Sequence, residues 1–192
     1  MNGKIIPIIT QPHRVLCAKA HDIPIAGIRH ARIRNLISNM KATLAITPDG
    51  VGLAAPQVGQ SLNLFIVSEE AEEIDRVETG RKKRNTPHAE DSNKPPYEKR
   101  PWKYYVFINP VVKNKSRKML DHAEGCLSVP QQYGIVPRHE KFTIEAYDEQ
   151  GKKIIRGASR FFARVLQHEL DHLEGKLFVD KATEFIDVGN PS

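Results

Sequence analysis

Two histidines four residues apart are the strongest chemical signal in the sequence. In the segment QHELDHLEG, residues 167–175, Glu169 lies between His168 and His172. Side chains at this spacing lie on one face of a helix with Cβ atoms roughly 5–6 Å apart, so both imidazoles can bind one metal ion. In HExxH helices the glutamate can act as a general base beside the open coordination position. A catalytic zinc-like ion needs a third protein ligand, and this segment does not supply it.

The residues around these histidines favour a buried helix over a solvated one. Apolar side chains lie on more than one side of the helix expected over residues 159–173, and Gly175 follows where a C-terminal glycine cap belongs. Buried imidazoles need polar partners, which favours the metal site over two solvated histidines. The apolar residues are Phe161, Phe162, Val165, Leu166 and Leu170.

The known downstream completions of HExxH fail here. A metzincin would have a histidine where this chain has Phe178, and a thermolysin-like site would need a glutamate on a second helix, for which the short tail leaves no room. Upstream, Cys126 lies in EGCLSVP, residues 124–130, and a thiolate binds such an ion well. A lone cysteine more often only fills space, so Cys126 by itself leaves the third ligand open. Cys17 has no such setting and is expected to be filler.

A glycine-rich segment, GVGLAAPQVG at residues 50–59, is the third candidate. It matches a dinucleotide-binding fingerprint only superficially, because that fingerprint needs a strand before the first glycine and a helix after it. Here a helix is expected before the segment and a strand after it. The glycines are better explained by close approach of the backbone to a ligand, with Gln57 offering its amide.

Together and in this order, the three segments resemble the signature motifs of the peptide deformylase family, and the resemblance extends over most of the chain. It implies a hydrolase that removes the N-formyl group from formylmethionine at the start of nascent polypeptides and releases formate. It also implies one divalent metal ion per chain, Fe²⁺ in many members, with Zn²⁺, Ni²⁺ or Co²⁺ as substitutes. The implied ligands are Cys126, His168 and His172.

The resemblance implies roles for the other site residues. Glu169 would be the general base and acid: metal-bound hydroxide attacks the formyl carbon, and Glu169 returns the proton to the leaving amine. Gln57 and the backbone N–H of Leu127 would bind the oxyanion, and Gly52 would pair with the substrate backbone. The substrate-binding residues would include Val51, in the methionine pocket with Phe161, Val165 and the stretch near Ile135, and Arg138 near the C-terminal side of the peptide.

The elements expected around these motifs indicate an α+β fold. A helix is expected over 27–46, strands over 61–67 and 104–112, and a hairpin from 141–148 into the following IIRG. Pro110 suggests an edge strand or a strand end. Because helix, strands and helix follow one another without strand–helix alternation, we expect antiparallel or mixed sheets packed around a central C-terminal helix that carries HExxH.

Length and composition indicate one soluble catalytic domain over residues 1–192. Residues 69–103 are charge-rich and are expected to form a polar, partly mobile surface insertion. No apolar run suits a membrane helix or a signal peptide, so we expect a cytoplasmic protein or an organellar one after transit-peptide removal. The expected state is a monomer with no membrane partner.

Charge is unevenly distributed along the chain. The net charge is +6, and residues 1–68 contain 7 Lys and Arg against 2 Asp and Glu. The tail after Phe178 is too short and too acidic for the basic C-terminal helix by which some bacterial members of the family dock on the ribosome. Contact with the ribosome surface would therefore use the basic first third, without specific nucleic-acid recognition.

Two other functions remain open from the sequence. The first is another HExxH metallohydrolase, such as a peptidase. The second is a structural metal or interaction protein, in which a fourth protein ligand closes the site.

Overall fold

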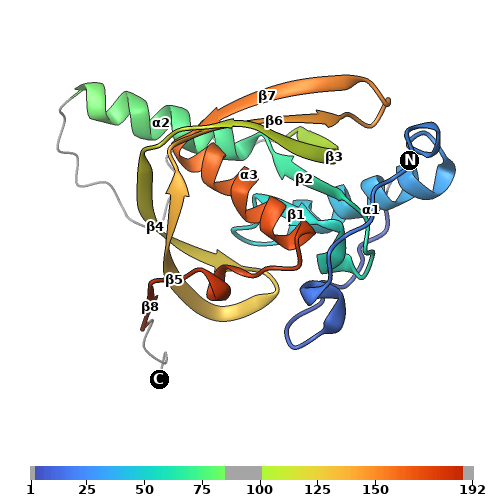
Figure 1. The fold of residues 1–192 in the computed structure, drawn as a ribbon, viewed down its shortest axis with the longest axis horizontal. Helices are drawn as coiled ribbons and strands as arrows, with labels where there is room; N and C mark the ends of the chain where they lie inside the picture. Colours follow the sequence, from blue (N-terminus) through green and yellow to red (C-terminus); the bar gives the residue numbers. More distant parts are fainter. Residues whose placement is uncertain (1–2, 85–100, 188–192) are drawn as a thin grey trace.

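The chain forms two antiparallel sheets and three α-helices within the residues that the structure describes, 3–84 and 101–187 (Figure 1). The structure is a computed structural model. No helix in these ranges is both long and apolar enough to cross a membrane. The helices are α1 (Ala31–Ile46), α2 (Glu70–Arg84) and α3 (Arg160–Leu173), and short 3₁₀ segments cover Arg14–Cys17, Ile25–Gly27, Ala55–Val58 and Phe178–Asp180. The strands are β1 (Gly52–Ala54), β2 (Leu64–Ser68), β3 (Tyr104–Lys115), β4 (Met119–Cys126), β5 (Val129–His139), β6 (Lys141–Tyr147), β7 (Lys153–Ser159) and β8 (Glu184–Ile186).

The larger sheet has the order β1-β2-β3-β6-β7, and the smaller one has the order β4-β5-β8. Neighbouring strands in both sheets are antiparallel. The expected α+β class with antiparallel sheets is confirmed, and so is the hairpin, which is formed by β6 and β7. Strand β1 lies at the edge of its sheet and pairs only with β2 among the described strands.

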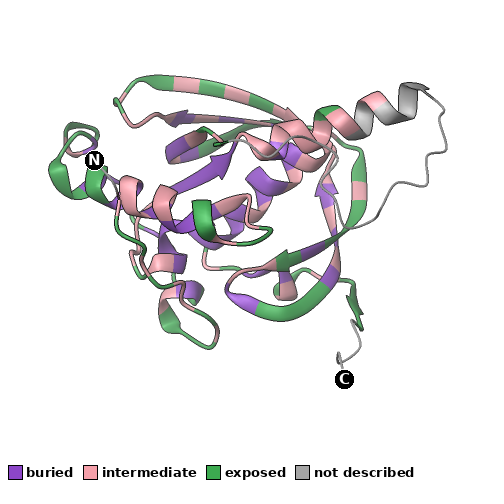
Figure 2. Ribbon diagram, turned by 180° about the vertical axis from the view of Figure 1, so that it is seen from behind, coloured by how far each residue is buried: buried purple, intermediate pink, exposed green. Residues whose placement is uncertain are grey.

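The larger sheet is covered on both faces, which explains the continuous apolar run of β2. All five β2 residues are buried, because alternate side chains point to opposite faces and both faces are packed. Leu64 and Ile66 join a core with α1, while Phe65 and Val67 join a core with α3. Figure 2 shows the buried residues concentrated on β2 and on the helical faces turned toward it.

Helix α3 lies close to the predicted span. Its apolar residues Phe162, Ala163, Val165 and Leu166 pack against the larger sheet, and on its other side it also contacts β5. Just past the helix, Gly175 has φ +69°, a conformation that favours glycine. A Cβ there would lie 2.7 Å from the Cys17 carbonyl carbon, so Gly175 also lets the N-terminal segment pack against the end of α3.

Pro110 does not mark a strand end, because β3 continues to Lys115. It does lie where β3 has an open edge on one side within the described residues, since β2 pairs only with residues 104–108 and β6 pairs with the rest of the strand. The β3–β6 register shifts between Ile108 and Val111, and Asn109 has φ +49°. A bulge at this point leaves proline outside the ladder, so the strand continues without the hydrogen bond that proline cannot donate.

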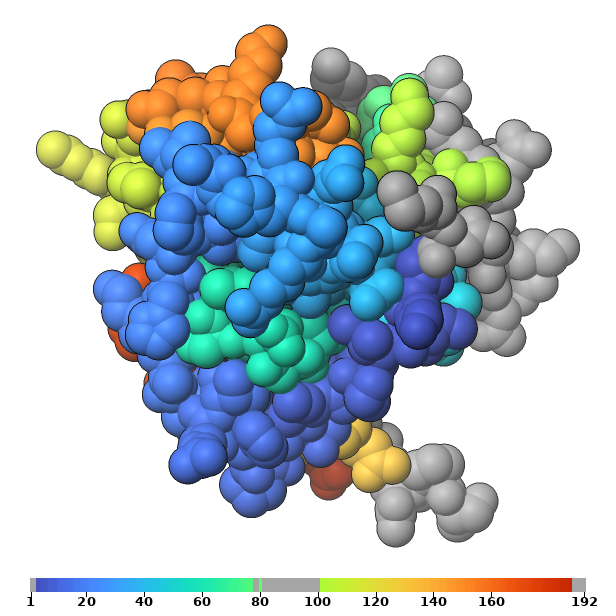
Figure 3. All heavy atoms as spheres, turned by 90° about the vertical axis from the view of Figure 1, so that its right-hand side faces the viewer, coloured from blue at the N-terminus to red at the C-terminus, as the bar shows by residue number. Residues whose placement is uncertain are grey.

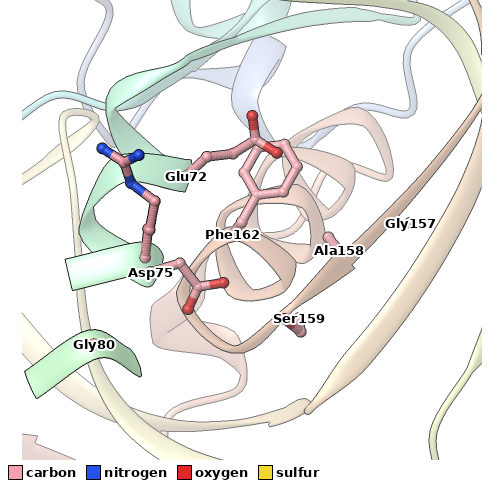
Figure 4. Close-up of a pocket in the computed structure, with 8 residues that line it drawn as sticks. Glu72, Asp75, Gly80, Gly157, Ala158, Ser159 and Phe162 are labelled. Atoms are coloured by element: carbon pink, nitrogen blue, oxygen red, sulfur yellow. The ribbon is translucent and has the colours of Figure 1, made fainter. Parts of the chain in front are cut away.

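The expected polar insertion begins as a helix instead of a loop. Residues 70–84 form α2, and residues 85–100 lie outside the described part of the chain. Two acidic side chains of α2 point toward α3 and β7 across a shallow cavity of about 620 Å³ (Figure 4). Glu72 accepts hydrogen bonds from the Tyr105 hydroxyl and the Arg156 guanidinium. Asp75 Oδ1 accepts from the Phe161 N–H at 3.3 Å.

The Asp75 contact supplies a cap that α3 does not make for itself. Ser159 occupies the N-cap position, but its side chain makes no capping hydrogen bond. The Phe161 N–H lies in the first turn of the helix, where N–H groups have no partner within the helix. A carboxylate at a helix N-terminus satisfies this donor and also interacts favourably with the helix dipole.

We predict that Asp75→Ala lowers the free energy of unfolding by about 0.5–2 kcal/mol, as is usual for a lost cap. Chemical denaturation measures this change, and hydrogen exchange of the Phe161 amide shows whether the cap is responsible. Arg76→Ala is the matched control, because Arg76 neighbours Asp75 on α2 and its side chain is 77% exposed. Unchanged protection of the Phe161 amide in Asp75→Ala would contradict the capping role.

Candidate active site

Three side chains from two distant segments meet at one point. His168 and His172 project from α3, and Cys126 ends β4. Cys126 Sγ lies 3.2 Å from His172 Nε2, and the possible ligand atoms of the three residues lie within 4.8 Å of one another. The structure thus brings together the three residues that the resemblance implied as metal ligands.

This donor set fits a divalent transition-metal ion. One thiolate and two imidazoles suit Zn²⁺ or Fe²⁺, and bonds of about 2.0–2.3 Å allow one ion to bridge atoms at these separations. Burial lowers the pKa of His172 well below its usual value, which favours the neutral imidazole that binds a metal. Burial opposes a charge on His168 as well, whereas hydrogen bonds with Cys126 and Glu124 raise its pKa.

Glu169 is buried beside this cluster, and burial raises the pKa of its carboxyl to about 7. Its Oε2 has no hydrogen-bond partner among the described residues. Its Oε1 packs against Gly52, where an added Cβ would lie only 2.3 Å from that oxygen. The absence of a side chain at Gly52 therefore leaves the space that the Glu169 carboxylate occupies. Glu169 Oε2 can exchange a proton with a water or a substrate near neutral pH.

Gln57 lies on the other side of the cluster, with its amide fixed in one orientation. Gln57 Oε1 accepts a hydrogen bond from the Ala54 N–H at 2.8 Å. The amide nitrogen must therefore point the other way, and it lies 3.6 Å from Cys126 Sγ and 3.3 Å from Ser128 Oγ. The short 3₁₀ segment that follows β1 thus aims an N–H donor at the metal-binding cluster.

A cleft of about 400 Å³ opens beside these residues. Its walls come from β1 and the segment before it, from the β4–β5 turn, and from the first turns of α3. Seven residues of the predicted set line it: Cys126, His168, Glu169, Gln57, Leu127, Gly52 and Val51. Phe161 and Val165, expected in the methionine pocket, also line the cleft, whereas Tyr133 lines it in place of Ile135.

Arg138 is not among the residues that line this cleft. It is buried, its guanidinium donates to both carboxylate oxygens of Glu124 at 2.7 and 2.8 Å, and it contacts Asp171 Oδ2 at 2.6 Å. Three of its nitrogens are thus occupied by carboxylates inside the protein, and the substrate-binding role implied for Arg138 stays a prediction. Arg138 holds Glu124, which contacts His168.

Glu124 connects Arg138 to the cluster, and the sequence analysis did not single it out. Its Oε2 lies 2.9 Å from His168 Nδ1, which leaves the other ring nitrogen of His168 for a metal. Burial alone would raise the pKa of Glu124, but hydrogen bonds from Arg138 and His168 lower it to about 2. The position of Glu124, two residues before Cys126, was the available signal, because a ligating histidine usually pairs with a carboxylate or carbonyl.

A cysteine and two histidines beside a buried carboxylate, in a cleft of an α+β domain, define the site of a metal-binding hydrolase. A family model described as polypeptide deformylase matches residues 5–186. The chain therefore belongs to the polypeptide deformylase family, and it is an enzyme of that family.

Individual relatives agree with this assignment. Peptide deformylase 2 of a Nostoc species is 36% identical over 181 residues, which cover 94% of this chain and 88% of the relative. Peptide deformylase 1A, chloroplastic/mitochondrial, of Arabidopsis thaliana is also 36% identical, and the match spans 91% of this chain but only 60% of that longer protein. A crystal structure of a class I type b peptide deformylase from Acinetobacter baumannii with Met-Ala-Ser bound superposes with a TM-score of 0.72 at 28% identity, covering 94% of this chain and 99% of that one.

We predict that Gly52→Ala reduces activity by about 10²-fold, because a displacement of about 1 Å at a reacting group is enough for such a loss. The added Cβ must push Glu169 or β1 out of place. The measurement is kcat/KM, with bound metal quantified in the same samples.

Gly157→Ala is the matched control, since its Cβ would meet only Thr143 Oγ1 at 3.8 Å. Full activity of Gly52→Ala would show that the close contact with Glu169 is not required.

Proposed function

We propose that this enzyme is a metal-dependent deformylase that removes the N-formyl group from the N-terminal formylmethionine of nascent polypeptides and releases formate. The observation that carries the proposal is the Cys126, His168 and His172 cluster with the buried Glu169 carboxylate beside it. Helix α3, which carries three of these residues, would be the central element around which the sheets of this single catalytic domain are arranged. We infer one divalent ion per chain, with Fe²⁺ as the native metal and Zn²⁺, Ni²⁺ or Co²⁺ as substitutes.

An ion bound by these ligands supplies Lewis-acid chemistry, since it polarises a carbonyl oxygen and lowers the pKa of water. Glu169 takes the proton of the attacking water and returns it to the amine that leaves when formate departs. Its raised pKa suits both directions of transfer near pH 7. The Gln57 amide and the Leu127 N–H stabilise the charge that develops on the formyl oxygen. In support, the Leu127 N–H donates no hydrogen bond within the described residues.

The peptide substrate would bind along β1. This strand has an unpaired edge within the described residues, and Gly52 on it lines the cleft. An extended peptide can add to such an edge through main-chain hydrogen bonds. Val51, Phe161 and Val165 line the same cleft and offer the apolar surface that a methionine side chain needs. The Met-Ala-Ser peptide bound to the Acinetobacter baumannii enzyme supports a substrate that begins with methionine.

The proposal predicts that anaerobically prepared, iron-loaded enzyme releases formate from a formyl-Met peptide, and that Glu169→Gln lowers kcat by about 10²–10⁴-fold, the usual contribution of a general base. Gln57→Ala should lose about 10²–10³-fold, as for one oxyanion donor. Both variants should keep their metal, because neither residue belongs to the ligand cluster.

Glu174→Gln is the matched control, a carboxylate at the end of α3 whose side chain is 53% exposed. Absence of formate release by the wild type would overturn the proposal. Cleavage of unformylated peptides would select the peptidase instead, and a fourth protein ligand closing the site would select a structural metal protein.

We further propose that the monomeric enzyme contacts the ribosome surface through its basic N-terminal third, in the cytoplasm or in an organelle. Residues 3–68 form most of the face in Figure 3. Arg29, Arg32 and Arg34 are exposed at the start of α1, and an exposed basic patch favours association with a polyanion such as ribosomal RNA. Reversing these three charges to Glu should reduce co-sedimentation with ribosomes at low salt.

Reversal of three basic residues elsewhere provides the control. Lys113, Lys115 and Arg117 are exposed at the end of β3 and just after it, and they lie as close together in the sequence as the three arginines. Equal co-sedimentation of the two triple variants would contradict a specific role for α1.

A further inference from the structure

A chain of four charged side chains runs from His168 to the surface. Glu124 bonds to His168, Arg138 bonds to Glu124, and Arg138 bonds in turn to Asp171. The last link is an ion pair of 2.5 Å between Asp171 Oδ1 and Lys181 Nζ. Glu124 belongs to β4, Arg138 to β5 and Asp171 to α3, and Lys181 directly follows the 3₁₀ segment Phe178–Asp180.

Burial decreases along this chain. The side chains of Arg138 and Glu124 are 5% and 4% exposed, that of Asp171 is 12% exposed, and that of Lys181 is 37% exposed. Lys181 and Asp171 border a groove that is lined by none of the three metal-binding residues. Lys181 is thus the outermost member of a network whose innermost member contacts a metal ligand.

The charges balance only when Lys181 is counted. Two carboxylates, Glu124 and Asp171, share the Arg138 guanidinium, and Lys181 supplies the second positive charge. If the lysine is removed, Arg138 is the one cation left among the four side chains, and Asp171 has no other cation beside it within the described residues. Glu124 keeps its hydrogen bond with His168. In a site of low dielectric an uncompensated charge is costly. Asp171 then attracts Arg138 more strongly, and the two Arg138 bonds to Glu124 weaken.

We propose that Lys181 is a positioning residue for the metal centre, which acts through Asp171, Arg138 and Glu124 on the orientation of His168. This inference rests on the metal site of the proposed function. Asp171 lies between the two histidine ligands on α3, so the ion pair also ties the ligand-bearing turn of the helix to the C-terminal segment. Carboxylates that bond to ligating histidines orient the ring and raise its basicity, and their loss typically reduces metal affinity by about 10–100-fold.

The test compares Lys181→Met with Lys181→Arg. Methionine keeps the unbranched stem of the side chain, one atom shorter and without the charge, whereas arginine keeps the charge. We expect Lys181→Met to lose metal to a chelator about 3–10 times faster than wild type, a smaller effect than at a direct partner of the ligand. The visible spectrum of the Co²⁺-substituted protein should shift in the same variant, because the His168 ligand changes its orientation. Lys181→Arg should restore both properties.

Lys19→Met is the matched control. It also removes an ion pair between a lysine and a carboxylate of the α3 C-terminus, Glu174, but this pair is exposed, and within the described residues no side-chain hydrogen bond or ion pair joins it to the network. Wild-type metal release and an unchanged Co²⁺ spectrum are expected for it.

Lower thermal stability of Lys181→Met with unchanged metal release and an unchanged spectrum would overturn the proposal, since the ion pair would then be only structural. If the wild-type enzyme binds no divalent ion, both the role of Lys181 and the proposed metal site are overturned. A wild type that binds the ion but releases no formate would overturn the proposed function alone, because metal retention and the Co²⁺ spectrum do not depend on the reaction.

Discussion

The arrangement of the site depends on the ion pairs that the buried guanidinium of Arg138 makes. Arg138 binds Glu124 on β4 and Asp171 on α3 while it belongs to β5, so one side chain fixes the smaller sheet against the helix. A buried charge that loses its partner destabilises a protein strongly, and the three groups therefore hold one another in a single arrangement. The result is that Cys126, two residues after Glu124, lies 3.2 Å from His172 and within 4.8 Å of a ring nitrogen of His168.

The larger sheet imposes a second constraint by positioning Glu169, the proposed base. Glu169 can lie where it does only because position 52 has no Cβ, and β1 can present that glycine because β2 holds it in register within a fully packed core. The Gln57 amide is oriented in the same region by the Ala54 N–H. The two sheets thus contribute different parts of the site. The smaller sheet supplies Cys126 and the Glu124–Arg138 ion pair, and the larger sheet supplies Gly52, against which Glu169 packs.

The elements that could be predicted from the sequence are those determined by residues within the same short segment. A helix over residues 159–173 follows from apolar spacing and a terminal glycine, and the ligands on it follow from one helical turn. Helix α2 could not be predicted in this way, because Glu72 on it is paired with Tyr105 and Arg156, which lie far away in the sequence. The ion pairs of Arg138 could not be predicted for a similar reason: its two carboxylate partners lie 14 and 33 residues away, and nothing near it in the sequence identifies them.

Helix α3 is held at both ends by segments outside the three motifs. At its start, Asp75 of α2 accepts the Phe161 N–H; at its end, Gly175 packs on Cys17 and Lys181 pairs with Asp171. A helix of 14 residues is about 21 Å long, so a small rotation or shift at either end moves the ligands in the middle. Because the ligands must converge within a few ångströms, the segments that fix the ends constrain the metal site as directly as the motif residues do. The polar insertion and the C-terminal segment are therefore part of the architecture of the site, although neither contributes a ligand.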